Sequence, residues 1–191
     1  MIRRVLRRLR RERGYSLVEM LIVLSILGVV MGSLTTLFVQ ASNAELDMNN
    51  RFQAQQAARL ALDKMRREVH CGSVATPAGA SSSVTITLPS YCKTGSGSIT
   101  WCTRSVATNR YALYRVVGTT CSGGVKWADY LVPTSTAPTC SGALCIFTYT
   151  AQSTSSLAKL HVDYPVNVKP TKTVELYELQ DDIVLRNSTR S

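Results

Sequence analysis

Residues 20–39 contain no charged side chain, and this apolar run constrains the chain more than any other feature. At about 1.5 Å per residue, a helix of that length spans about 30 Å, the thickness of a bilayer core. An arginine-rich segment precedes the run, and few basic residues follow it directly. The positive-inside rule therefore places residues 1–14 in the cytoplasm and the C-terminal bulk of the chain outside.

The chain's formal charge of +10 is concentrated at its start. Residues 1–14 hold seven arginines and one glutamate, a net +6, so only +4 remains for the rest of the chain. We interpret this basic segment as a topology signal and not as a nucleic-acid surface. The length of 191 residues and the hydrophobic content of 45% favour one globular domain with an appendage.

A glycine, Gly14, stands directly before the apolar segment, and Glu19 interrupts the beginning of that segment. A secretory signal would place its small-residue cleavage site after the run, where residues 41–44 fit poorly. The stretch GYSLVEMLIVLSILG, residues 14–28, resembles the class III signal of type IV pilins and type II secretion pseudopilins. The matching positions are Gly14, Tyr15, Ser16, Leu17, Val18 and Glu19.

The resemblance implies cleavage between Gly14 and Tyr15 by a prepilin peptidase. It also implies N-methylation of the new terminus at Tyr15, although phenylalanine is commoner there in the family. A carboxylate in a membrane helix costs roughly 2.5 kcal/mol or more unless it is paired. In the family, the residue matching Glu19 pairs with the N-terminal amine of a neighbouring subunit. The alternative is an uncleaved signal anchor with Glu19 at the headgroups. Gly28 and Gly32 form a GxxxG close-packing motif.

The helix is expected to continue to residue 71, because residues 41–69 contain neither proline nor glycine. One face repeats apolar residues at helical spacing and should pack on a sheet. Its members are Ala54, Ala58, Leu62, Met65 and Val69. Asp63–Arg67 and Lys64–Glu68 are expected as i,i+4 pairs on the solvent side, and Gly72 as the stop. Residues 53–72, QAQQAARLALDKMRREVHCG, resemble this region in W-type minor pilins and J-type minor pseudopilins.

After the helix, aromatic and β-branched windows alternate with turns, which predicts antiparallel strands. Residues 73–83 are expected to form a loop. The expected strands lie within residues 84–88, 98–104, 110–117, 125–132, 145–150, 157–166 and 173–187. In the sixth window, Leu160, Val162 and Tyr164 share one face, and His161 and Asp163 lie opposite.

The predicted fold is α+β: a long N-terminal helix, transmembrane in its first half, packed on a C-terminal antiparallel sheet. The expected divisions are a cleaved leader at 1–14 and a hydrophobic transmembrane and assembly helix at 15–40. An amphipathic continuation at 41–71 and a β-rich, disulfide-bonded domain at 72–191 follow.

Six cysteines follow the apolar segment: Cys71, Cys92, Cys102, Cys121, Cys140 and Cys145. An even number in a domain outside the cytoplasm predicts three disulfides, whereas no spacing suits zinc. Closeness in sequence suggests Cys92–Cys102 and Cys140–Cys145, which leaves Cys71 with Cys121. The count alone leaves many other pairings open.

No catalytic motif is present, and no cofactor is expected. His70 is interpreted as a partner of the helix C-terminus, and His161 as a residue on the outer face of a strand. Asp181 and Asp182 could bind calcium, as in some pseudopilins, but adjacent carboxylates are usually just solvated. We therefore expect a structural protein and not an enzyme.

The resemblance implies a minor pilin or pseudopilin that primes or caps a type IV pilus-like filament. The alternatives are a minor pseudopilin of a type II secretion system, or a tip adhesin or DNA-uptake subunit. For DNA, the sequence offers a basic-aromatic face made of Lys126, Trp127, Arg110, Tyr111 and Arg115, although such residues more often lie on the solvent side without function. The implied partners are other subunits, the prepilin peptidase, an inner-membrane assembly platform and membrane lipid. The implied location is the inner membrane and then a periplasmic or cell-surface filament.

Overall fold

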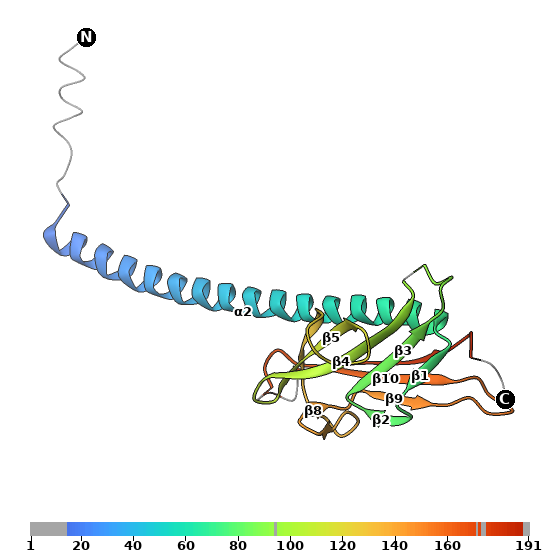
Figure 1. Ribbon diagram of the computed structural model, residues 1–191. Coiled ribbons are helices and arrows are strands. Elements are labelled where there is room, and N and C mark those ends of the chain that lie inside the picture. Colours follow the sequence, from blue (N-terminus) through green and yellow to red (C-terminus); the bar gives the residue numbers. More distant parts are fainter. Residues whose placement is uncertain (1–14, 94, 171, 173–174, 189–191) are drawn as a thin grey trace, which may run out of the picture. The chain divides into compact units, whose positions relative to one another are not determined.

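The computed structural model describes residues 15–93, 95–170, 172 and 175–188, and its fold is α+β as predicted. One helix, α2 (Leu17–Cys71), leads into a series of strands (Figure 1). The bounds of this helix agree with the sequence prediction at both ends. The chain divides into two compact units, residues 1–48 and residues 49–191.

Within the first unit, residues 17–48 form the beginning of α2, and the apolar side chains are exposed. The carbonyl of Ser16 accepts hydrogen bonds from the backbone N–H groups of Glu19 (2.9 Å) and Met20 (3.1 Å). The most apolar window of the helix has a mean hydropathy of 2.4, and none of it is buried in the protein. By length and composition, this segment can cross a membrane.

Within the second unit, residues 49–71 of α2 lie on the sheet and bury one face. The buried apolar residues are Ala54, Ala58, Ala61, Leu62, Met65 and Val69, which confirms the predicted face and adds Ala61. The helix ends where predicted, at Gly72, whose N–H still donates to the carbonyl of Glu68 at 2.8 Å. A Cβ at Gly72 would lie 2.5 Å from Cγ2 of Ile86, so the close approach to the sheet requires glycine here.

The strands of the second unit are all antiparallel, as predicted. They are β1 (Val74–Thr76), β2 (Gly79–Ser81), β3 (Ser83–Leu88), β4 (Gly97–Ala107), β5 (Arg110–Val117), β6 (Val125–Leu131), β7 (Thr139–Cys140), β8 (Ala143–Leu144), β9 (Phe147–Thr150), β10 (Lys159–Val166) and β11 (Tyr177–Val184). The nine-stranded sheet has the order β1-β3-β4-β5-β6-β10-β9-β2, with β11 also paired to β10. Strands β7 and β8 form a separate hairpin.

The predicted loop at 73–83 is wrong, because it contains β1 and β2. These short strands follow each other in the chain but pair with β3 and β9, at opposite ends of the strand order. Their sequences lack the long β-branched runs that mark a strand, so tertiary pairing and not local propensity places them in the sheet.

Strands β6 and β10 are joined at a single paired position, Leu131 with Val166, so the sheet is weakly paired here. Just before this position, Tyr130 adopts a positive φ of 61°, which is uncommon for a residue other than glycine. The carbonyl of Tyr130 accepts the N–H of Asn167 at 2.9 Å, which ties β6 to the end of β10.

The core lies between the second half of α2 and the sheet. Its largest fully buried side chains include Trp101, Tyr164, Phe147 and Met65. Tyr164 donates to the Met65 sulfur at 3.5 Å, and burial raises the pKa of its phenol well above the usual range. The faces predicted for β10 are confirmed on the inner side, where Leu160, Val162 and Tyr164 are buried.

Candidate functional site

The three disulfides join all six cysteines: Cys71–Cys92, Cys102–Cys121 and Cys140–Cys145. Their Cα–Cα distances are 6.0, 6.1 and 5.8 Å, within the range that a disulfide requires. The pairing of Cys140 with Cys145 agrees with the sequence prediction. The predicted pairs Cys92–Cys102 and Cys71–Cys121 are wrong.

Strand register explains the error for Cys92 and Cys102. The last pair of the β3–β4 hairpin joins Leu88 to Gly97, so Cys92 lies in the loop beyond the hairpin. Cys102 lies five residues into β4, which at about 3.3 Å per residue is far from the loop. Cys92 instead bonds to the end of α2, and Cys102 bonds to the loop after β5.

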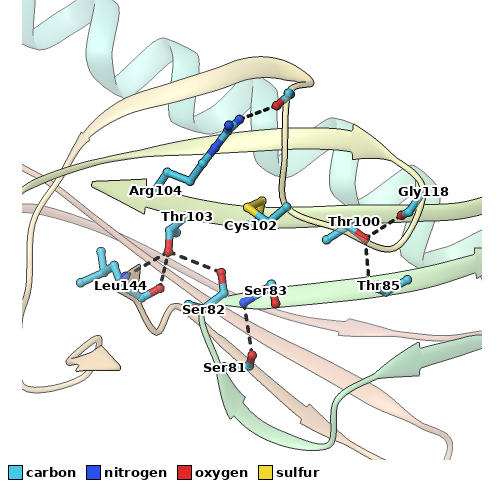
Figure 2. Close-up of a disulfide and its surroundings, with 12 residues drawn as sticks. Ser81, Ser82, Ser83, Thr85, Thr100, Cys102, Thr103, Arg104, Gly118 and Leu144 are labelled. Carbon is cyan, nitrogen blue, oxygen red and sulfur yellow. Dashed lines mark hydrogen bonds between the residues drawn. A yellow bond between two sulfur atoms is a disulfide. The ribbon is translucent and has the colours of Figure 1, made fainter. Parts of the chain in front are cut away.

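Hydroxyl groups around Cys102 connect the strands of this region (Figure 2). Oγ1 of Thr100 donates to the carbonyl of Gly118 at 2.7 Å. Oγ1 of Thr103 donates to the carbonyl of Leu144 at 2.6 Å and accepts the N–H of the same residue at 3.0 Å. The two Thr103 bonds join β8 to β4 by satisfying backbone groups of the buried Leu144.

Glu68 was expected on the solvent side of the helix, and this prediction is wrong because its side chain is fully buried. Its carboxylate accepts hydrogen bonds from Nε1 of Trp101 and Nε of Arg115, both at 2.8 Å. The ammonium of Lys64 lies 3.3 Å away, so that predicted pair does form. The other predicted pair does not, since Asp63 binds Arg66 at 3.1 Å and not Arg67.

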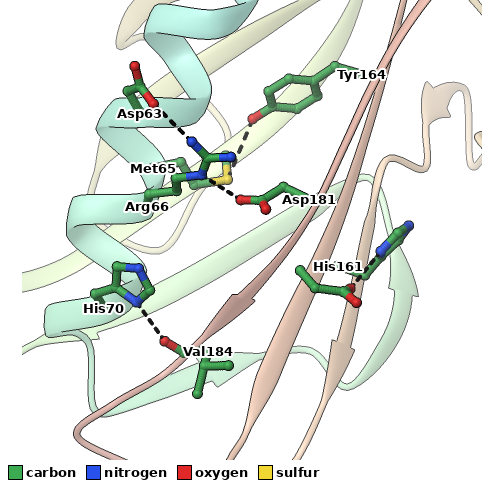
Figure 3. Close-up of polar contacts among 9 residues, drawn as sticks. Asp63, Met65, Arg66, His70, His161, Tyr164, Asp181 and Val184 are labelled. Atoms are coloured by element: carbon green, nitrogen blue, oxygen red, sulfur yellow. Dashed lines mark hydrogen bonds and ion pairs between the residues drawn. The ribbon is translucent and has the colours of Figure 1, made fainter.

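A row of polar contacts links α2 to β11 (Figure 3). Arg66 donates to Asp181 at 2.6 Å, and this hydrogen bond raises the pKa of the guanidinium. Nδ1 of His70 donates to the carbonyl of Val184 at 2.9 Å, so His70 holds the strand as well as ending the helix.

The two carboxylates considered for calcium point to opposite sides of β11, as adjacent strand residues do. Asp181 faces the helix and binds Arg66. Asp182 binds His161 at 2.8 Å and Lys159 at 3.1 Å on the other side, and the His161 bond lowers the pKa of Asp182. They therefore cannot share one ion, and no group of three potential ligands occurs among the described residues.

Asp163 was expected opposite the core, but it is buried, with only 2% of the residue exposed. Neither carboxylate oxygen has a hydrogen-bond partner within residues 15–188 that the structure describes. Nothing in the sequence distinguishes Asp163 from the solvated carboxylates of β11. A buried carboxylate without a partner is a destabilising feature.

The predicted basic-aromatic face is not a continuous surface. Tyr111 is buried, and Arg115 is turned inward to Glu68. Trp127 packs on Trp101 with ring centroids 5.9 Å apart. Only Arg110 and Lys126 remain on the outer side, where both bind Asp129. The alternation of β5 explains this, because residues 111, 113 and 115 face the helix.

The signal region begins the described part of the chain. Gly14 lies outside the described residues, and Tyr15 is 78% exposed directly before the helix. Glu19 lies in the first helical turn, where the helix dipole favours a negative charge. No hydrogen bond or ion pair involves its carboxylate within the described residues.

The glycines of the GxxxG motif face open space. A Cβ at Gly28 or Gly32 would meet no atom within 4 Å. The nearby hydroxyls of Ser25, Ser33 and Thr35 donate to carbonyls of their own helix, at 2.8 Å each. These hydroxyls are therefore satisfied without water, as an apolar environment requires.

Comparison with protein-family models matches residues 9–35 to the prokaryotic N-terminal methylation motif. This match covers Gly14, Tyr15, Glu19 and the glycine pair. No curated protein and no solved structure matches the chain. The motif marks prepilins that carry a class III signal, and the long apolar helix followed by a disulfide-bonded β domain agrees with it. The chain therefore carries the N-terminal signal of a type IV pilin-like prepilin.

Proposed function

We propose that the protein is a minor pilin or minor pseudopilin, a structural subunit that primes or caps a type IV pilus-like filament. The observation that carries this proposal is the carboxylate of Glu19, which has no partner among the described residues, on a helix whose apolar side chains are exposed there. Every large apolar residue from Leu17 to Val39 is about half exposed or more. Such a surface must be covered by lipid before assembly and by the apolar helices of other subunits in the filament.

Glu19 gives this association its register. Cleavage between Gly14 and Tyr15 leaves an α-amine on Tyr15 one helical turn before the carboxylate. Leaving Glu19 unpaired in an apolar bundle costs roughly 2.5 kcal/mol or more. The charge is satisfied only when the amine of a neighbouring subunit docks at the matching height, so the cost of burial selects one axial offset.

The remaining assignments follow from this function. The prepilin peptidase processes the chain, and Tyr15 receives the methyl group. Before assembly, the subunit lies in the inner membrane, with its N-terminus in the cytoplasm and its β domain outside. An assembly platform then moves it into the filament. Gly28 and Gly32 provide a flat strip for a neighbouring helix, because glycine lets two backbones approach closely.

The test compares filament incorporation of Glu19→Ala with that of the wild-type chain. Glu45→Ala is the matched control, because Glu45 is an exposed carboxylate on the same helix beyond the apolar run. Sheared filaments and membranes are fractionated and probed for the subunit. We expect Glu19→Ala to reach the membrane in a processed form and to be depleted from filaments, and Glu45→Ala to behave as the wild type.

Equal incorporation of both variants would show that Glu19 does not guide assembly. Retention of the leader on wild-type protein, in cells that process other prepilins, would favour an uncleaved signal anchor. The two results are separable, because the first is read in filaments and the second in the intact mass of membrane protein.

A further inference from the structure

Strand β11 forms a long open edge of the sheet. Among the described residues it pairs with β10 alone, so its other side has no neighbouring strand. The strands at the two ends of the strand order, β1 and β2, have three residues each, whereas β11 has eight. Unpaired backbone groups along such an edge are a template for another strand. β11 therefore offers an added strand more to pair with than β1 or β2 does.

The hydrogen bonds at the end of β11 show which of its residues face the open edge. In an antiparallel pair, successive residues direct their backbone groups alternately toward the partner strand and away from it. Leu185 donates its N–H to the carbonyl of Ala158 at 2.9 Å, so Leu185 faces the β10 side. Val184 therefore faces away from β10, and its carbonyl accepts a hydrogen bond from Nδ1 of His70 on α2 at 2.9 Å (Figure 3).

Three residues of β11 share this outward direction. Glu178, Gln180 and Asp182 lie an even number of positions before Val184, so their backbone groups also point away from β10. All three residues are exposed. No hydrogen-bond partner for their backbone groups occurs on this side among the described residues. The edge thus presents a regular row of backbone donors and acceptors to solvent.

A hollow of about 290 Å³ lies beside this edge, between α2 and β11, and we call it the α2–β11 hollow. Its lining consists of Arg59, Leu62, Asp63, Arg66, Tyr177 and Leu179. Leu179 stands between Glu178 and Gln180, and its side chain points to the opposite face of the strand. In a strand added to the edge, the residue between the partners of Glu178 and Gln180 faces the hollow in the same way. The side chains of Leu62, Tyr177 and Leu179 provide apolar contact for that residue.

The charges beside the edge indicate which strand fits. Glu178 is exposed and forms no ion pair with any residue that the structure describes. Asp182 is compensated, because Lys159 lies 3.1 Å and His161 lies 2.8 Å from its carboxylate. Opposite charges on directly paired residues stabilise a sheet. A lysine or arginine opposite Glu178 would therefore complete the charge balance of this edge.

A second copy of the chain fits the edge poorly. An antiparallel pairing through all three positions places Glu178 of each copy opposite Asp182 of the other, and like charges directly opposite each other are destabilising. Shifted registers leave fewer backbone groups paired. Charges on an edge strand are a common device against pairing between copies. A helix does not fit either, because its backbone groups are already paired within the helix.

We propose that β11 receives an extended strand of a partner protein, which carries a lysine or arginine opposite Glu178 and a small apolar side chain over the α2–β11 hollow. In strand addition, main-chain hydrogen bonds supply the affinity, and pockets for alternate side chains supply the specificity. The open positions of β11 provide the first, and the hollow together with Glu178 provides the second. Valine suits the position over the hollow, because β-branched residues are favoured in strands.

The experiment titrates a fluorescent, end-capped heptapeptide of alternating lysine and valine with the full-length chain in a non-ionic detergent. Fluorescence anisotropy reports binding, which we expect below about 1 mM. The control peptide has the same sequence and charge but carries a methyl group on the backbone nitrogen of each lysine. These nitrogens would donate to β11, so their methylation should weaken binding at least about tenfold.

Two substitutions at one position separate the backbone of β11 from its side chains. Gln180→Pro removes an N–H that points away from β10, and proline is tolerated on an edge strand in that position. It should weaken binding of the lysine–valine peptide at least about tenfold. Gln180→Ala keeps the N–H and should bind as the wild type does. Tryptophan fluorescence checks that both variants are folded, and the methylated peptide tests the same hydrogen bonds on the unaltered chain.

The charge is tested with Glu178→Gln, which should weaken binding about 2- to 5-fold. Glu45→Gln is the matched control, because Glu45 is an exposed carboxylate of α2, and it should leave binding unchanged. Absence of binding to the wild type at about 1 mM peptide would overturn the proposal. Equal binding of the methylated peptide would overturn it as well, because attraction by charge alone would then suffice. Dimers of the wild type that Gln180→Pro dissociates would show that a second copy occupies the edge, which contradicts the proposal.

Discussion

At the scale of single residues, Glu68 makes the most consequential contact between α2 and the sheet. Its buried carboxylate is surrounded by the indole of Trp101, the guanidinium of Arg115 and the ammonium of Lys64. Removing one member of a buried ion pair leaves the other charge poorly solvated, and this costs more than the pair contributed. A surface pair such as Asp63–Arg66 contributes about 1 kcal/mol at most.

We therefore expect Glu68→Gln to destabilise the β domain strongly. The amide can still accept the Trp101 hydrogen bond, but it leaves Arg115 uncompensated, at a cost near the lower end of about 3–5 kcal/mol. Urea unfolding followed by the fluorescence of Trp101 and Trp127 measures this change. Asp63→Asn is the control and should change stability by less than about 1 kcal/mol; equal effects of the two substitutions would contradict the assigned role.

Gly72 allows the helix to end against the sheet, and its replacement tests that contact. A Cβ at this position would lie 2.5 Å from Cγ2 of Ile86. We expect Gly72→Ala to cost about 1–3 kcal/mol through overpacking. Gly28→Ala is the comparison, because it meets no atom of the chain and should leave the unfolding curve unchanged. An unchanged stability for Gly72→Ala would mean that β3 shifts to make room for the added Cβ.

At the scale of elements, the disulfides fix segments that secondary structure holds weakly. Cys71–Cys92 ties the end of α2 to the β3–β4 loop, and Cys140–Cys145 closes the short β7–β8 hairpin. Their sequence separations are 21 and 5 residues. Because the longer loop loses more chain entropy when it is closed, the first bridge should contribute more.

Replacing both cysteines of one bridge by alanine tests this order. The Cys71–Cys92 double variant should lose about 3 kcal/mol, and the Cys140–Cys145 double variant about 2 kcal/mol, in the chain-entropy account. Denaturant midpoints of the oxidised proteins provide the comparison. Non-reducing peptide mapping of the wild type checks the pairings, and a Cys92–Cys102 peptide would refute the connectivity described above.

The contacts of Asp129, on β6, predict that the stability of the protein decreases in acid. Burial alone would raise the pKa of Asp129, but hydrogen bonds from Arg110, Lys126 and the Tyr130 N–H lower this pKa overall, below the usual range of an aspartate. A lowered folded-state pKa means that the contribution is present above about pH 4 and is lost as the pH falls through the folded value.

Asp129→Asn should therefore lose less stability than the wild type between about pH 5 and about pH 2.5. Thermal unfolding at the two pH values measures the difference. Glu178→Gln is a suitable control, because Glu178 is an exposed carboxylate of β11. An identical acid response of Asp129→Asn and the wild type would show that Asp129 is not held by its cations in solution.

At the scale of the whole molecule, the charge distribution predicts a change on maturation. The proposed cleavage after Gly14 would remove +6 of the formal +10 and leave +4. The mature protein should therefore have a lower isoelectric point than the sequence value of about 9.6. Intact-mass analysis of membrane-extracted protein should give a chain that begins at Tyr15 and carries one added methyl group. A chain that still begins at Met1 would contradict this prediction.

The sequence alone determined the features that depend on local periodicity. The helix bounds at Leu17 and Cys71, the apolar face from Ala54 to Val69 and most strands follow from spacing that the chain itself imposes. The signal in residues 14–19 is equally local, because glycine, glutamate and the apolar run must fall in register. Cys140–Cys145 could be predicted because its hairpin is short.

Only the tertiary structure decided which residues meet across long separations. Strand register separates Cys92 from Cys102. It also brings Glu68 to Trp101 and Arg115, which lie 33 and 47 positions further along the chain. The same register turns Trp127 inward and groups Arg104 with Arg110 on the outer side. Alternation along a strand says that neighbours face opposite ways, but only the packed sheet shows which way is in.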